Sequence, residues 1–277
     1  MTPDLSGRIA WVTGGARGQG RSHARALAAV GAHVYVSDIA HQVDTVNYPL
    51  ATPAELETTV AEIVDAGGQA TAVQLDVRDS TAVTELVDHI VDQHGRLDIL
   101  VANAGICAFV PLEDMTDEQW ADMVGTNLTG TFHCVRAAVT AMKRNRFGRV
   151  VGVSSGAGRG GMKDLSHYSA TKWGIIGFVK SVALEVGSYG ITANVVCPTS
   201  VDTPMVMNET TLRRFRPDLD DPSPDDAKPV FAGLGPLGIP WLEPEDVTRA
   251  VMYFVDDPGL TTGTVLEVNL GTSANRI

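Results

Sequence analysis

Apolar residues along this chain fall into short, nearly continuous runs that are separated by longer stretches of mixed polarity. The runs are rich in Val, Ile and Ala and recur almost to the end of the chain. Strands that are apolar on both sides are typical of a parallel sheet covered by helices on both faces. The predicted strands are RIAWVT (8–13), HVYVSD (33–38), ATAVQL (70–75), DILVA (98–102), RVVGVS (149–154), ITANVVC (191–197) and TVLEVN (264–269).

The stretches between these runs contain helix start signals. Thr52-Pro53-Ala54-Glu55 reads as a capping box with proline at the first helical position, Thr116 and Gln119 repeat the box, and Pro244 opens a later helix. This alternation predicts an α/β fold, a doubly wound (Rossmann-like) parallel sheet of about seven strands with helices on both faces. We see no linker and no repeat, so residues 1–277 are predicted to form a single domain.

Two segments interrupt the alternation of strands and helices. Residues 39–54 form a long passage between the second strand and its helix, and residues 199–243 form a longer irregular stretch. Connections of this length are usually binding loops, lids or disordered segments. Both follow the carboxyl ends of strands, where open α/β sheets bind ligands. We therefore expect an insertion at 39–54 and a substrate lid at 199–243.

Composition narrows the possible partners. The net charge of −12 over 277 residues argues against nucleic acid and against an anionic membrane surface. No apolar stretch approaches the ~18 residues of a membrane span, and the first residues lack a signal-peptide pattern. The three cysteines have no C-x-x-C spacing, and no Cys/His/carboxylate cluster predicts a metal site. We expect a cytoplasmic protein.

The first predicted strand runs directly into a glycine-rich turn, TGGARGQG (13–20), and then a helix. Glycines at 14, 18 and 20 allow a tight turn and let a pyrophosphate approach the backbone. The helix that follows offers free N–H groups and the positive end of its dipole to the phosphates. This arrangement predicts a dinucleotide site that includes Gly14, Gly18 and Gly20.

Asp38 ends the second predicted strand, where a carboxylate can accept hydrogen bonds from the adenosine ribose hydroxyls. Its charge would repel a 2′-phosphate, which favours NAD over NADP. Arg17, within the turn, argues the other way because a guanidinium could pair with that phosphate. We give the greater weight to Asp38 and predict NAD.

The sequence SHYSATK (166–172) contains a candidate acid/base pair. On a helix, Tyr168 and Lys172 lie four residues apart on one face. An ammonium beside a phenol stabilises the phenolate and lowers its pKa from about 10, as the positive nicotinamide of NAD⁺ also would. Tyr168 could then exchange a proton with a substrate alcohol or ketone while hydride moves to or from the cofactor.

Two polar residues complete the predicted chemistry. Ser155 follows the fifth predicted strand at the cofactor edge, and its hydroxyl can donate to the substrate oxygen beside Tyr168. Asn127 lies in a predicted helix, MVGTNLTG, and could hold a water that links Lys172 to solvent. The predicted catalytic residues are therefore Asn127, Ser155, Tyr168 and Lys172.

Residues 152–156, GVSSG, also match the G-x-S-x-G pattern of a serine esterase. Such an enzyme needs Ser, then an acid, then His along the chain. The one histidine after Ser154 is His167, and Asp164 is the only acidic residue between the two. The residues that follow, GAGRGGMKDL, do not read as the helix that should come after the nucleophile. We interpret the match as accidental.

Taken together, these motifs resemble the short-chain dehydrogenase/reductase family over nearly the whole chain. The matching stretches are TGGARGQG, Asp38, DV (76–77), ANAG (102–105), Asn127, Ser155, YSATK (168–172) and PTSVDTPM (198–205). The resemblance implies a homotetramer, a catalytic role for the four residues above, and a contact between Lys172 and the nicotinamide ribose. The implied cofactor-binding residues are Gly14, Arg17, Gly18, Gln19, Gly20, Asp38, Ile39, Asp76, Val77, Asn103, Ala104, Gly105, Tyr168, Lys172, Pro198, Val201 and Thr203.

The insertion, DIAHQVDTVNYPLATPAEL, is similar to the extra segment of carveol-dehydrogenase-like members associated with the redox cofactor mycofactocin. That likeness implies oxidation of a cyclic or terpenoid secondary alcohol, with bound NAD re-oxidised in place by an external redox partner. A 3-oxoacyl-thioester or other ketone reductase is the alternative within the family. A serine esterase and a non-catalytic NAD sensor are disfavoured. The expected apolar wall of the substrate site is Ile106, Phe109, Met162, Leu165, Met205, Met207, Phe231 and Trp241.

Overall fold

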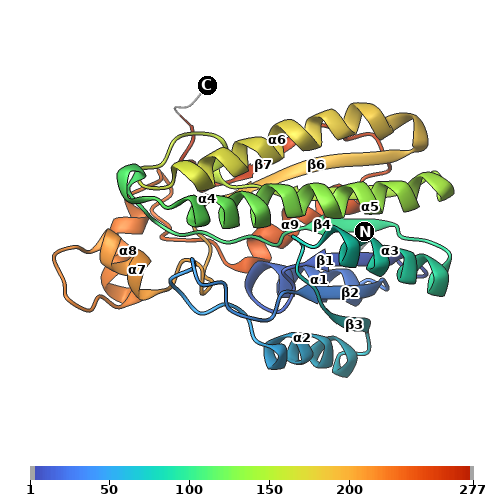
Figure 1. Cartoon of the computed structure of the whole chain (residues 1–277), viewed down its shortest axis with the longest axis horizontal. Helices are drawn as coiled ribbons and strands as arrows, with labels where there is room; N and C mark the ends of the chain where they lie inside the picture. Colours follow the sequence, from blue (N-terminus) through green and yellow to red (C-terminus); the bar gives the residue numbers. More distant parts are fainter. Residues whose placement is uncertain (1–3, 275–277) are drawn as a thin grey trace.

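A single parallel sheet forms the centre of the computed structural model, which describes residues 4–274 (Figure 1). Its strand order is β3-β2-β1-β4-β5-β6-β7, so the order reverses between β1 and β4 as in a doubly wound fold. Each strand lies within one residue of its predicted position, which confirms the predicted fold. The strands are β1 (Ile9–Thr13), β2 (His33–Asp38), β3 (Gln69–Gln74), β4 (Ile99–Ala102), β5 (Gly148–Val153), β6 (Ile191–Pro198) and β7 (Val265–Val268).

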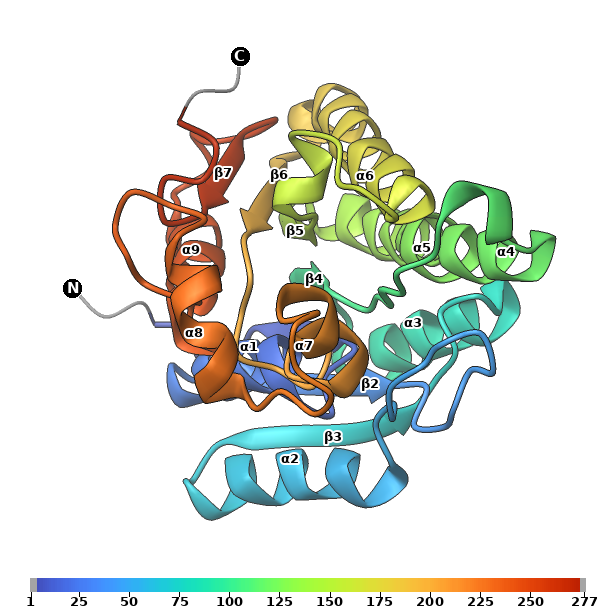
Figure 2. The same cartoon turned by 90° about the vertical axis from the view of Figure 1, so that its left-hand side faces the viewer.

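Helices cover both faces of the sheet, with α1, α2 and α9 on one face and α3, α5 and α6 on the other (Figure 2). Each face encloses its own apolar cluster, which explains why the strands are apolar on both sides. The helices are α1 (Gly18–Ala29), α2 (Pro53–Asp65), α3 (Ser80–His94), α4 (Asp117–Val124), α5 (Gly130–Asn145), α6 (Ser166–Val186), α7 (Glu209–Phe215), α8 (Pro224–Ala232) and α9 (Pro244–Asp256), with short helical turns η1 (Leu112–Asp114), η2 (Gly125–Thr129), η3 (Gly156–Gly158) and η4 (Gly187–Tyr189).

The predicted helix starts are present. Thr52 caps α2 in a reciprocal box with Glu55, and Thr116 caps α4 in the same way with Gln119. Each box satisfies backbone N–H groups that a helix otherwise leaves without partners. Helix α9 begins at Pro244, as expected.

Residues 199–243 are more ordered than the sequence suggested, because the structure places helices α7 and α8 within them. Asn208 caps α7 by accepting a hydrogen bond from the backbone N–H of Thr211, and Ser223 caps α8 in a box with Asp226. The prediction of an irregular stretch was wrong over these two helices. The capping sequence Ser-Pro-Asp-Asp at 223–226 could have revealed α8.

The insertion at 39–54 and the 199–243 segment lie at the same end of the sheet (Figures 1 and 2). The first follows the carboxyl end of β2 and the second follows that of β6. Both segments therefore border the edge where a doubly wound sheet binds ligands.

Across the described residues, no helix has the length and apolar character needed to cross a membrane.

Candidate active site

A cavity of about 370 Å³ opens at the carboxyl ends of the strands. Its wall takes residues from the glycine-rich turn, the insertion, the ends of β2, β5 and β6, and the 199–243 segment. With the exception of Asn127, every residue predicted to bind the cofactor or to act in catalysis lines this cavity. The fold therefore gathers residues from seven separate stretches of sequence at one place.

The glycine-rich turn needs glycine for steric reasons. Gly14 has a φ of +64°, and a Cβ there would lie 2.8 Å from the Cα of Ala104. A Cβ on Gly20 would overlap the carbonyl oxygen of Gly14. Asn103 fastens the turn by donating from its side-chain amide to the carbonyl oxygens of Thr13 and Gly14, at 2.9 and 3.1 Å. The backbone before α1 is thus held open towards the cavity.

Two polar groups beside this turn fit a dinucleotide. The carboxylate of Asp38 accepts hydrogen bonds from the backbone N–H groups of Ala16 and Ala40, at 3.1 and 3.2 Å, and lines the cavity. Burial raises the Asp38 pKa, while these two hydrogen bonds act to lower it. Gln19 also lines the cavity, and its buried Oε1 has no hydrogen-bond partner. A glycine cradle, a ribose-facing carboxylate and an unpartnered amide oxygen are compatible with NAD.

Arg17 lines the cavity but also contacts the insertion and α2. Its guanidinium donates to the carbonyl oxygen of Pro49 at 2.5 Å and lies 4.0 Å from the carboxylate of Glu55. Arg17 therefore connects the glycine-rich turn to the insertion. These contacts engage part of the guanidinium and so weaken the sequence argument for NADP.

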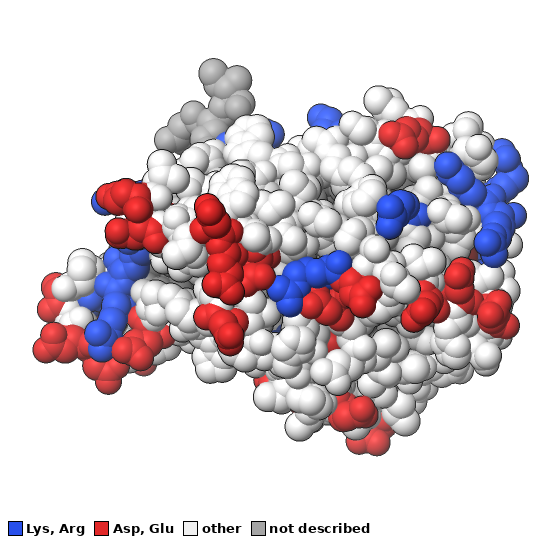
Figure 3. Space-filling view, in the orientation of Figure 1, with Lys and Arg blue, Asp and Glu red and all other residues white. Residues whose placement is uncertain are grey.

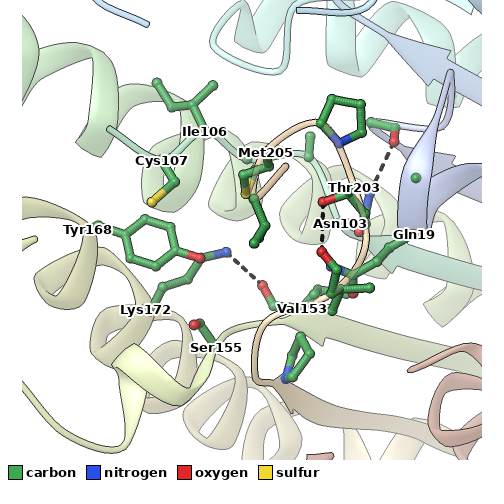
Figure 4. A pocket seen from close by; sticks show the side chains of 18 of the residues that line it. Gln19, Asn103, Ile106, Cys107, Val153, Ser155, Tyr168, Lys172, Thr203 and Met205 are labelled. Carbon is green, nitrogen blue, oxygen red and sulfur yellow. Dashed lines mark hydrogen bonds between the residues drawn. The ribbon is translucent and has the colours of Figure 1, made fainter. Parts of the chain in front are cut away.

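Tyr168 and Lys172 lie on the same face of α6, one turn apart (Figure 4). The Lys172 Nζ lies 5.4 Å from the centre of the Tyr168 ring and donates to the carbonyl oxygen of Val153 at 3.0 Å. Both side chains are buried. The last carbonyl of β5 therefore orients the lysine beside the phenol.

The direction of the Tyr168 pKa differs from the prediction. Burial raises the pKa of Tyr168, although a hydrogen bond with Ser155 acts to lower it. Burial also lowers the pKa of Lys172 to about 8. Removal of water therefore disfavours the charged form of both groups, and the expected effect of Lys172 on the phenol is smaller than this desolvation.

Ser155 and Ser154 face different partners. The Ser155 side chain lines the cavity and accepts a hydrogen bond from the backbone N–H of Ala157 at 3.1 Å. Ser154 is buried, and its hydroxyl donates to the carbonyl oxygen of Lys172 at 2.8 Å. Ser155 therefore faces the cavity near Tyr168, whereas Ser154 attaches the end of β5 to α6.

The esterase hypothesis is wrong on geometry. Ser154, the central serine of GVSSG, is engaged by a backbone carbonyl, and neither ring nitrogen of His167 has a hydrogen-bond partner. Among residues 4–274, neither Ser154 nor Ser155 forms a hydrogen bond with a histidine that could generate a nucleophile. Within residues 4–274, no group of three or more His, Cys, Asp or Glu side chains could hold a metal ion.

Asn127 lies in η2, a single π-helical turn between α4 and α5. Its side chain accepts from the backbone N–H of Ile106 at 2.8 Å and donates to the carbonyl oxygen of the same residue at 2.9 Å. Such turns inside helices are frequent at functional sites. The amide of Asn127 thus fixes the chain next to Gly105. A Cβ added at Gly105 would lie 3.2 Å from the Asn127 Oδ1 and 3.6 Å from the Lys172 Nζ. The water relay remains a prediction.

Tyr48 and Cys107 are two of the lining residues that the sequence did not identify. Tyr48, from the insertion, is buried, and its hydroxyl accepts from the backbone N–H of Cys107 at 3.3 Å. Cys107 lies beside Tyr168 (Figure 4). Burial raises the pKa of the Cys107 thiol to about 12, which keeps it neutral. Neither residue belongs to a recognisable local motif, and only the packing of the insertion brings them together.

The part of the cavity beyond Tyr168 is mainly apolar. Six of the eight expected wall residues line it, but Met207 and Trp241 do not. Trp241 instead packs edge-on against Phe231, with ring centres 5.6 Å apart, and so supports the wall from behind. The lining residues are Ile106, Phe109, Met162, Leu165, Met205 and Phe231, together with Phe215 and Leu234.

Comparison with known proteins agrees with this geometry. The family model described as short chain dehydrogenase matches residues 8–213. The chain belongs to the short-chain dehydrogenase family. Its cavity, with a glycine-rich turn at one end and a Tyr–Lys pair at the other, is thus the candidate active site of an oxidoreductase.

Three relatives within this family cover nearly the full chain. The (-)-trans-carveol dehydrogenase of Rhodococcus erythropolis is 41% identical over 97% of this chain and 98% of its own length. A 3-oxoacyl-[acyl-carrier-protein] reductase of Synechocystis is 35% identical, over 96% and 97%. The crystal structure of carveol dehydrogenase from Mycobacterium avium in complex with NAD superposes with a TM-score of 0.95 at 40% identity, over 99% and 100%.

The buried ammonium of Lys172 leads to a stability prediction. Its pKa is about 8 in the folded chain, against an ordinary value of 10.5, so the unfolded chain binds more protons between these pH values. The stability of the wild type should therefore rise with pH across this window. At pH values below both pKa values, Lys172 is charged in the folded and the unfolded chain. Burial of this charge then lowers the free energy of unfolding by the full effect of the pKa shift, roughly 3 kcal/mol.

We expect Lys172→Met to be at least as stable as the wild type at about pH 7, and to lose this advantage at about pH 9.5. Urea unfolding at both pH values would measure the difference. Lys180→Met, which changes a lysine further along the same helix, is the control. A Lys172→Met variant that is less stable by the same amount at both pH values would contradict the expectation.

Proposed function

We propose that this protein catalyses the NAD-dependent interconversion of a compact secondary alcohol and its ketone. One observation carries the proposal: Ser155, Tyr168 and Lys172 line the same cavity as the glycine-rich turn and Asp38. A dinucleotide held by the turn and the carboxylate would extend towards the Tyr–Lys pair. The carveol dehydrogenase relatives support the same reaction class.

The proton steps are assigned to residues of this chain. The Ser155 hydroxyl donates a hydrogen bond to the substrate oxygen, and the Tyr168 oxygen takes the alcohol proton or returns it to the ketone. Lys172, oriented by the Val153 carbonyl, supplies positive charge beside the phenol. Bound NAD⁺ would accept the hydride and add a second positive charge, which favours the phenolate. Asp38 would hold the adenosine ribose.

We propose a compact, apolar and cyclic alcohol, of terpenoid type, as the substrate. The aromatic and methionine side chains of the cavity wall suit such a molecule. A carrier-linked acyl thioester is less compatible, because it brings phosphate groups to this end of the protein. Acidic side chains of residues 218–226 lie there around α7 and α8, together with basic side chains, and two of them pair with Arg216 and Lys228 (Figure 3).

We further propose that NAD remains bound between turnovers and that an external redox partner of the mycofactocin type re-oxidises it. The insertion supports this proposal because it is fastened on several sides. Arg17 holds Pro49, and Tyr48 holds Cys107. Thr45 donates to Asp122 at 2.7 Å. These attachments would have to open for a dinucleotide to leave.

We also propose assembly into a homotetramer. Large apolar side chains are exposed along the outer helices α4, α5 and α6, where a second copy could cover them. These side chains are Trp120, Phe132, Trp173 and Leu184.

Removal of the Tyr168 hydroxyl tests the catalytic proposal. We expect Tyr168→Phe to lower kcat for alcohol oxidation by about 10²–10⁴-fold, the usual effect of losing a positioned acid/base. NAD binding, measured by calorimetry, should remain. Tyr35→Phe is the matched control, since it removes a hydroxyl that bonds to His94 away from the cavity. Unchanged turnover by Tyr168→Phe would refute the assigned role.

A charge change at the ribose tests the choice of cofactor. We expect Asp38→Ala to raise the kcat/KM ratio for NADP over NAD by at least about tenfold, because the repulsion of a 2′-phosphate is removed. Asp44→Ala removes the same charge from an exposed position in the insertion and should leave the ratio unchanged. If the wild type already prefers NADP, the assignment of Asp38 is wrong.

Retention of the cofactor is tested by purification without added nucleotide. We expect the wild type to release NAD on heat denaturation. Arg17→Ala should release several-fold less NAD, because the insertion is no longer attached to the glycine-rich turn through Pro49. Arg25→Ala removes a neighbouring, more exposed arginine and is the control. A nucleotide-free wild type that turns over freely with added NAD would refute retention but leave the proposed reaction intact.

A further inference from the structure

The apolar part of the cavity is enclosed by three segments that are distant in sequence. Phe109 comes from the segment after β4, Met162 and Leu165 come from the segment before α6, and Phe215 ends α7. These segments share no strand pairing with one another. Something other than the sheet must therefore set their spacing.

An ion pair joins these three segments at one point. The carboxylate of Asp164 contacts the guanidinium of Arg214 on α7, and the same guanidinium lies 5.2 Å from the ring centre of Phe109. The backbone carbonyl oxygen of Asp164 accepts from the N–H of Val110 at 2.9 Å. Asp164 and Arg214 each precede a lining residue, Leu165 and Phe215. The pair is thus part of the outer support of the cavity wall.

The local conformations also indicate that the pair is built into this wall. Asp164 has a φ of +61°, a left-handed conformation that aspartate tolerates better than most side chains. The Asp164 and Arg214 side chains are 13% and 34% exposed, so solvent screens the pair only in part. The contact is therefore stronger than that of an open surface pair.

The Asp164–Arg214 contact is one of the attachments of helix α7. This helix has only seven residues, too few to be stable alone. Its Phe215 ring stacks on Phe231 of α8, with ring centres 4.1 Å apart, so the two helices form a small unit of their own. The Arg214 side chain attaches this unit to the segment before α6. Loss of the attachment would let α7 move away from the cavity.

We propose that the Asp164–Arg214 pair determines which substrates the cavity accepts, by holding its wall at a size that suits compact molecules. This inference rests on the proposed alcohol dehydrogenase function. Compact alcohols fit while the pair is formed, whereas a larger alcohol must break it to bind. Asp164 and Arg214 are therefore specificity-determining residues that act through the wall, and neither needs to touch the reacting atoms.

The test compares two secondary alcohols in the same variants. The compact probe is carveol, and the larger probe is a hydroxysteroid. We expect Arg214→Ala and Asp164→Asn to raise the kcat/KM of the larger alcohol relative to carveol by about fivefold, equivalent to about 1 kcal/mol. The change should appear mainly in KM of the larger alcohol. Both alcohols are measured with the same preparation of each variant. The ratio of their kcat/KM values therefore does not depend on the fraction of the protein that is folded.

Arg213→Ala is the matched control. Arg213 neighbours Arg214 on α7 but pairs with Glu209 at 2.9 Å on the exposed side of the helix. In Arg213→Ala we expect the ratio of kcat/KM for the larger alcohol to that for carveol to equal the ratio of the wild type. A wild type that oxidises carveol, with an unchanged ratio in Arg214→Ala and Asp164→Asn, would overturn this inference and leave the proposed function standing. A wild type that oxidises neither alcohol with NAD would overturn both.

Discussion

The hydrogen bond from Lys172 to the carbonyl oxygen of Val153 is the interaction on which the site depends. It attaches the catalytic helix α6 to the end of β5 and places a buried ammonium beside a buried phenol. Ser154 strengthens the same junction from the other side by donating to the Lys172 backbone. The pair is thus positioned by the sheet edge itself, and the glycine-rich turn at the end of β1 presents a cofactor to that same edge.

Most of the fold and the members of the site could be predicted because their signals are local. Apolar runs mark the strands, and the glycines before α1 and the i,i+4 spacing of Tyr168 and Lys172 are short patterns. What failed depends on packing between distant segments. The partner of Arg17, the approach of Tyr48 to Cys107 and the pKa direction of Tyr168 all follow from where the insertion folds and how much water it excludes.

The two long segments at the sheet edge cover different sides of the cavity. The insertion adds Tyr48 and the Arg17–Pro49 contact on the cofactor side. The segment with α7 and α8 adds Phe215 and Phe231 on the substrate side. Neither is part of the sheet, so each can vary while the strands keep their arrangement. The relatives of this chain include proteins as different as a carveol dehydrogenase and a 3-oxoacyl reductase.

Burial has opposite consequences for stability and for chemistry at this centre. Desolvation disfavours the ammonium of Lys172 and the phenolate of Tyr168, the two charged forms that proton exchange requires. In a solvated site the same charges would form readily, but water would also screen their mutual effect. Because Tyr168 and Lys172 are buried, water screens a positive charge beside the phenol less than it would in an open site. A positive charge can act on the phenol in this way only if it lies close to the Tyr–Lys pair, and the glycine-rich turn and the pair do line one cavity.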